Sequence, residues 1–93
     1  MHPKTFILDR NCLDDHTASV VADYLTDLAH DGPVKIHLDF RQVEWIGSAA
    51  VGTLIGLNRR VGRLVLDNVN ETVADVLRLT RLDQVLEIRR KVA

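Results

Sequence analysis

The chain has 93 residues and a formal net charge of −1, which fits one small domain over residues 1–93 without a basic face for nucleic-acid binding. Its single cysteine excludes an internal disulfide and a thiolate metal cage, and its four histidines do not fall at a metal-ligand spacing. The sequence shows neither a signal peptide nor an apolar run near the roughly 18 residues of a membrane helix. We therefore expect a cytoplasmic protein without metal, cofactor or membrane insertion.

The first half of the chain predicts a strand, a helix and a second strand. Residues 5–8 are apolar and partly β-branched, which favours a strand. Residues 15–30 carry apolar side chains at helical spacing, and Asp14 can cap the start of that helix. Residues 34–40 alternate between apolar and polar, which predicts a strand with one buried face. On its other face this strand would present three side chains to solvent: Lys35, His37 and Asp39.

The second half continues the alternation of helices and strands. A helix is expected over residues 48–60, a strand over 64–66, a helix over 71–79 and a short apolar segment after it. Strand–helix–strand units of this kind imply parallel pairing. Two glycines lie inside the first of these helices, where each costs on the order of 1 kcal/mol relative to alanine. At Gly52 and Gly56 we therefore expect close approach of another backbone.

The turn before residues 48–60 is the candidate functional site. Ser48 stands where the helix would start, and serine is a preferred N-cap. A negative charge is favoured at such a position by the helix dipole. The spacing around it resembles a phosphate-binding P-loop, but Thr53 stands where that motif has its lysine. The G-x-S-x-G motif of serine hydrolases is also absent, because Ala50 occupies the position of its last glycine. We therefore expect no enzyme.

The order of elements and the residues at their joints resemble the STAS domain, a family that includes bacterial anti-sigma factor antagonists and the cytosolic tails of sulfate transporters. Three segments carry the resemblance: residues 13–18, 34–52 and 63–86. The resemblance implies an α/β fold, with a small, mixed, largely parallel sheet of about four strands and three to four helices.

The family's loop typically reads Asp-Ser-Ser-Gly-Leu-Gly, and a partner kinase phosphorylates its first serine. Ser48 falls on that serine and Gly52 on the final glycine. Four positions depart from the family pattern. In the loop, Gly47 replaces the acidic residue, Ala49 the second serine and Ala50 the first glycine. After the third helix, Arg81 stands where the family usually has a glycine. The resemblance makes Ser48 the phosphorylation candidate.

The resemblance implies a non-enzymatic regulator of transcription that binds an anti-sigma factor or a switch-type serine kinase through residues 45–51 and the following helix. The predicted contact residues are Trp45, Gly47, Ser48, Ala49, Ala50, Val51 and Thr53. An alternative is a constitutive STAS subunit of a signalling complex or of a lipid or anion transport system, without a phosphate switch. A nucleotide or small-molecule binder ranks third. We expect a monomer or a weak dimer.

Several of these residues also have purely structural interpretations. For Trp45 an anchor that packs the loop onto the core is favoured over an exposed partner contact, although tryptophan is enriched at binding hot spots. Ser48 can be a plain N-cap. Asp39 is interpreted as a solvated carboxylate, and Cys12 as a small buried hydrophobe. Asn58 lies on the polar side of its helix, in an interface or in water.

Overall fold

The computed structural model describes residues 3–92 and contains two β-sheets and three α-helices. In chain order the elements are β1 (Lys4–Ile7), β2 (Cys12–Leu13), α1 (Asp15–Leu28), β3 (Val34–Asp39), β4 (Trp45–Ile46), α2 (Ser48–Val61), β5 (Gly62–Val69), α3 (Glu71–Leu79), the 3-10 turn η1 (Leu82–Gln84) and β6 (Glu87–Arg90).

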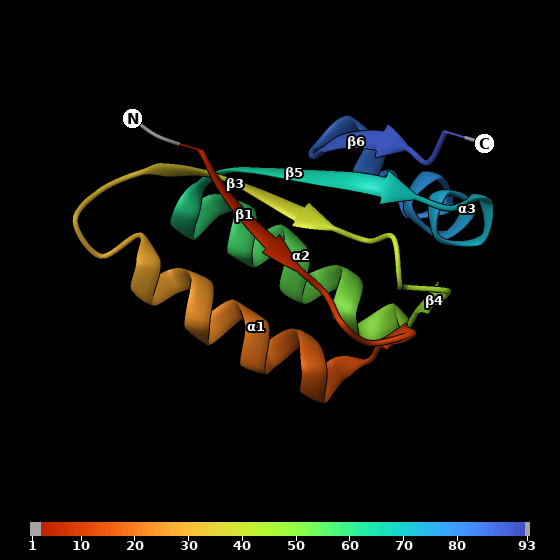
Figure 1. The fold of residues 1–93 in the computed structure, drawn as a ribbon, viewed down its shortest axis with the longest axis horizontal. Helices are drawn as coiled ribbons and strands as arrows, with labels where there is room; N and C mark the ends of the chain where they lie inside the picture. The colour runs from red at the N-terminus through yellow and green to blue at the C-terminus, as the bar shows by residue number, and fades with distance from the viewer. Residues whose placement is uncertain (1–2, 93) are drawn as a thin grey trace.

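The main sheet has the strand order β1-β3-β5-β6, and each of these three pairings is parallel. Figure 1 shows α1 and α2 side by side on one face of this sheet, with α3 beyond the end of β5. Strands β2 and β4 form a second, two-stranded parallel sheet at the carboxyl-end side of β1 and β3. The expected α/β class, with a largely parallel sheet of about four strands and three to four helices, is confirmed; the main sheet has only parallel pairings rather than mixed ones.

The core lies between the main sheet and the helices. The buried side of β3 contributes Ile36 and Leu38, and Phe40 directly follows the strand; all three side chains are fully buried. Helices α1 and α2 place Leu25 and Leu54 against it. Burying one such side chain stabilises the fold by about 1.5–3 kcal/mol, so the alternation in β3 and the apolar stripes of the helices fix how the two layers face each other. Within residues 3–92, no helix is long and apolar enough to cross a membrane.

Gly62 explains why β5 begins earlier than expected, directly after α2. The chain passes from α2 directly into β5 at this glycine, whose φ of 112° is readily adopted only without a side chain. A Cβ at this position would also lie 2.9 Å from the Cβ of Pro33. The residue therefore allows a strand to begin without a loop.

The close approach expected at Gly52 and Gly56 is wrong. A Cβ added at Gly52 would meet no atom within 4 Å, and one added at Gly56 would meet the Arg60 guanidinium at 3.4 Å. Both glycines lie on the side of α2 that faces away from the core, so neither is explained by internal packing. Close approach of a backbone occurs instead at Gly62.

The polar side of β3 is less solvated than expected. The side chain of His37 is 16% exposed, and its Nδ1 lies 2.8 Å from Oδ2 of Asp67 on β5. Asp39 is 4% exposed and accepts hydrogen bonds from the backbone N–H and side chain of Arg41 and from the amide of Asn68. The solvated-carboxylate interpretation of Asp39 is therefore wrong, because the neighbouring strand and the following loop supply donors that surround it.

Candidate functional site

The loop before α2 is held by the segment before α1. Strand β4 pairs with β2, so that Trp45 lies opposite Cys12 and Ile46 opposite Leu13. Beyond this pair, the backbone N–H of Gly47 donates to the carbonyl of Leu13 at 2.9 Å. The start of α2 is therefore fixed to a part of the chain more than 30 residues earlier in the sequence.

Asn70 holds the same loop from the other side. Its amide Nδ2 donates to the carbonyls of Val43 and Glu44 at 3.1 Å each, and its Oδ1 accepts the N–H of Val73 at 2.8 Å. One side chain thus caps α3 and binds the residues that lead into β4. The sequence identifies Asn70 as a cap, because an asparagine before a helix is a local signal. Its bonds to the loop are not visible in the sequence.

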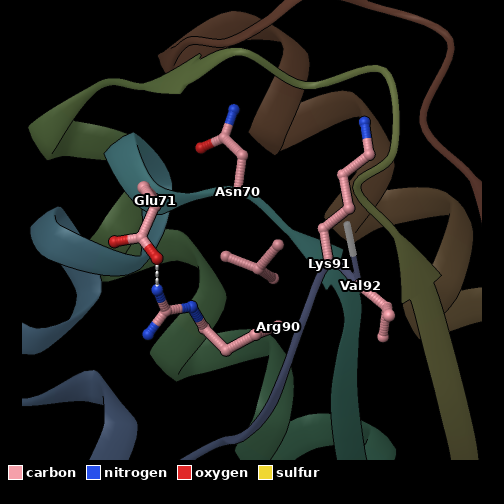
Figure 2. Close-up of a pocket in the computed structure, with 6 residues that line it drawn as sticks. Asn70, Glu71, Arg90, Lys91 and Val92 are labelled. Atoms are coloured by element: carbon pink, nitrogen blue, oxygen red, sulfur yellow. Dashed lines mark hydrogen bonds and ion pairs between the residues drawn. The ribbon is translucent and has the colours of Figure 1, made fainter.

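A hollow of about 300 Å³ lies beside Asn70, where β5 ends and α3 begins (Figure 2). On one side, Arg90 of β6 forms an ion pair with Glu71 in the first turn of α3. Lys91 and Val92 line the other side. The Arg90–Glu71 ion pair joins β6 to α3, and Asn70 already accepts an N–H of α3, so two of the polar side chains that line the hollow have partners within the protein. Among residues 3–92, no group of three or more His, Cys, Asp or Glu side chains could hold a metal ion.

Ser48 is the first residue inside α2, and the N-cap is Gly47, with φ −79° and ψ 152°. The expectation that Ser48 itself caps the helix is wrong by one residue, because the bond from Gly47 to Leu13 fixes the extended conformation at Gly47. Helices α1 and α3 have side-chain caps from Asp14 and Asn70, whereas α2 has neither a side-chain cap nor an acidic residue in its first turn. Ser48 is exposed at this uncapped, electropositive helix end.

The residues around Ser48 divide into a surface group and a core group. Trp45 is 51% exposed and is not the expected anchor; Val43 and Ile46, at 2% and 5%, fill that role. Ala50 and Val51, two of the predicted contact residues, are 0% and 6% exposed and belong to the core. The residues of this region that remain accessible, here named the loop surface, are Trp45, Gly47, Ser48, Ala49, Gly52 and Thr53.

Other polar residues near the site have structural partners. Asn58 accepts the backbone N–H of Leu64 at 2.9 Å and so joins the end of α2 to β5. The hydroxyl of Thr53 donates to the carbonyl of Ala49 at 3.5 Å, a long bond. Cys12 is half-buried rather than buried. Burial and the neighbouring Asp14 carboxylate raise the pKa of the Cys12 thiol, so it is not the thiolate that a nucleophile requires.

Comparisons with known proteins agree with this architecture. A family model described as the STAS domain matches residues 8–93. A crystal structure of a candidate anti-sigma factor antagonist from Thermotoga maritima superposes with a TM-score of 0.72 at 24% identity, covering 95% of this chain and 80% of that chain. That similarity shows the fold. A search of curated proteins found no match. With the family model covering nearly the whole sequence, the chain belongs to the STAS domain family.

Proposed function

We propose that this STAS domain is a non-enzymatic regulatory module that binds an anti-sigma factor or a switch-type serine kinase through the loop surface and α2. Phosphorylation of Ser48 releases the partner. The observation that carries the proposal is the exposed Ser48 hydroxyl at an uncapped helix N-terminus, next to the exposed ring of Trp45.

Electrostatics allow a phosphate at Ser48 without loss of the fold. A phosphoserine adds about −1.5 to −2 charges near neutral pH. The helix dipole favours a negative charge in the first turn by roughly 0.3–1 kcal/mol, and α2 has no acidic residue there to oppose it. The same charge would be costly to bury in a partner contact made by a small, largely apolar surface.

The shape of α2 suits a close partner. Its exposed side carries Ser48, Ala49 and Gly52, which are all small. The space around Gly52 is open for at least 4 Å. A partner backbone can therefore approach this side closely, while Trp45 supplies a large apolar contact of the kind found at binding hot spots. This accounts for an interior glycine that the fold itself does not require.

Two variants of Ser48 test the proposal. Binding to an anti-sigma factor or a switch-type serine kinase from the same organism is measured by titration calorimetry. Ser48→Asp is expected to weaken binding at least tenfold, about 1.4 kcal/mol, with a nearly unchanged melting temperature. Ser48→Ala is expected to bind as the native chain does. Ser19→Asp, which adds the same charge at an exposed serine of α1, is the matched control.

Equal affinity of Ser48→Asp and Ser48→Ala would remove the loop surface from the contact. Incubation with the kinase and ATP, followed by mass spectrometry, tests the modification separately. We expect one phosphate on Ser48 and none on Ser48→Ala. Because Gly47 replaces the acidic residue of the family pattern, we expect the reaction to be slower than is usual for the family.

Gly47 favours one alternative, a constitutive STAS subunit of a signalling complex or transport system. A Cβ at Gly47 would make only ordinary contacts, with the Leu13 carbonyl at 3.7 Å, so packing does not require a glycine there. The structure therefore has room for an acidic side chain at position 47, and its absence has no steric cause. Partner binding that persists while the kinase leaves Ser48 unmodified would favour this alternative.

A further inference from the structure

Strand β1 is an edge of the main sheet with free backbone groups. Among residues 3–92 it pairs only with β3, from Lys4↔Ile36 to Ile7↔Asp39 without a break. The N–H of Leu8 donates towards β3, to the carbonyl of Asp39 at 3.1 Å. Since successive residues of a strand direct their backbone groups to opposite sides, those of Thr5 and Ile7 point outwards, to the open side.

The two edges of the sheet differ in how they are protected. Strand β6, at the other edge, has an irregular register with β5 and carries Arg89 and Arg90. Bulges and charged side chains of this kind discourage the addition of another strand. In β1 the pairing is regular, Ile7 is 51% exposed, and the sole charge is Lys4 at its first position. The β1 edge is therefore open to a further strand.

An exposed apolar stripe of α1 lies beside this edge. Val20, Tyr24 and Leu28 follow one another at intervals of four residues and are 56%, 52% and 36% exposed. The ring of Tyr24 lies 5.4 Å, centroid to centroid, from the ring of Phe6 on β1. A hollow of about 330 Å³ between the two elements is lined by Phe6 and Val20, among others. Edge and stripe thus form one continuous surface.

We propose that a second copy of this chain binds here, with the two β1 strands antiparallel about a two-fold axis at Phe6. Thr5 then faces Ile7 of the second copy, so the residues whose backbone groups point outwards exchange hydrogen bonds. In the same arrangement the two α1 helices are antiparallel, and Val20 faces Leu28 of the second copy. The stripe is centred on Tyr24 and the strand on Phe6. Because these two rings are in contact, a single axis satisfies both elements.

The charges at the ends of β1 complement each other in this arrangement. Lys4 begins the strand and Asp9 follows its end, and both are exposed. The antiparallel pairing places each Lys4 within one residue of Asp9 of the second copy, which gives two symmetry-related ion pairs. Asp23 and Asp27 are exposed and lie on the solvent side of the stripe, at the rim. A contact made by one short strand and one side of a helix buries less surface than the roughly 800 Å² per partner that is typical of a stable complex. We therefore expect a weak dimer.

Sedimentation velocity over a concentration series reaching about 1 mM, the limit of weak binding, measures the association. Val20→Lys places a charge in the stripe, and Thr5→Pro removes an outward N–H at an edge position where proline is tolerated. Each variant is expected to raise the dissociation constant of the dimer at least tenfold. A cooperative thermal unfolding transition shows that each variant is folded. Val85→Lys is the matched control, because Val85 is 54% exposed outside this surface, and it should leave association unchanged.

Charge reversal tests the antiparallel arrangement itself. Lys4→Glu and Asp9→Lys should each weaken the dimer, and the double variant should restore it. A double variant as weak as the single ones would overturn the arrangement. Wild-type protein that stays monomeric up to about 1 mM would overturn the proposal and leave this surface to another partner. Trp45→Ala should leave self-association unchanged, so this result is independent of the function proposed for the loop surface.

Discussion

Asn70 is a residue whose two roles depend on different atoms of its side chain. The oxygen caps α3, and the nitrogen binds two carbonyls of the loop that leads to β4. Aspartate is as good an N-cap as asparagine, but it has no donor for those carbonyls. A substitution that keeps the cap can therefore isolate the contribution of the loop.

We predict that Asn70→Asp lowers the free energy of unfolding by about 1–3 kcal/mol, because two carbonyls lose their donor and face a carboxylate. Urea unfolding measures this change. The fluorescence of Trp45, the chain's single tryptophan, should also shift because the loop is released. The control is Asp14→Asn at the cap of α1, which accepts only from Thr17 and should change stability by a few tenths of a kcal/mol. Equal effects at both caps would contradict a role in holding the loop.

At the scale of an element, α2 is a helix whose interior glycines face outwards. Leucine is close to alanine in helix propensity, and glycine is about 1 kcal/mol worse. Because the space around Gly52 is open, a leucine there has room. The change should affect what the helix binds rather than whether it forms.

Gly52→Leu is therefore predicted to unfold at the wild-type temperature or slightly above it, and to bind the anti-sigma factor or kinase at least tenfold more weakly. Calorimetry of unfolding and of binding gives both values. Gly62→Leu, a matched change where φ is 112° and an added Cβ would lie 2.9 Å from the Cβ of Pro33, should instead destabilise the protein severely. A Gly52→Leu protein that melts well below the wild type would show internal packing that the structure does not contain.

At the scale of the whole molecule, stability depends on carboxylates that join neighbouring strands and loops. Burial by itself raises the pKa of Asp39, but hydrogen bonds from Arg41 and Asn68 outweigh it and hold that pKa below its ordinary value. Bonds from Arg63 and Arg89 lower the pKa of Glu87, and the N–H of Thr17 lowers that of Asp14. In each case the folded protein binds a proton less readily than the unfolded chain.

We predict that the contribution of these carboxylates to the free energy of unfolding is fully present above their unfolded-state pKa, about 4, and is lost as the pH drops through their lower folded-state pKa values. Urea unfolding at a series of pH values from about 7 down to about 2, a range that includes the ordinary pKa of a carboxyl group, measures this contribution. Asp39→Asn should lower stability at neutral pH and flatten the acid dependence. If the variant keeps the wild-type slope, Asp39 does not contribute to it.

Much of the fold was predictable because its signals lie within single elements. The alternation of residues 34–40 identifies β3, and the spacing of apolar residues identifies α1, α2 and α3 within about two residues. The family's loop pattern makes Ser48 the candidate for phosphorylation, which stays a prediction, and the structure shows that the residue is exposed. These features depend on the order of side chains along one segment.

The tertiary structure alone decided which polar groups are buried and how the loop surface is formed. Three hydrogen bonds join partners that are 27 to 30 residues apart in the sequence: His37 with Asp67, Asp39 with Asn68, and Asn70 with Val43. The N-cap of α2 is Gly47 rather than the expected Ser48, again because of a partner distant in the sequence: the Leu13 carbonyl accepts the Gly47 N–H and fixes the backbone there. A local pattern gives the face on which a side chain lies. It does not give the donor that a neighbouring strand brings to that face, because parallel pairing joins segments that are distant in the chain.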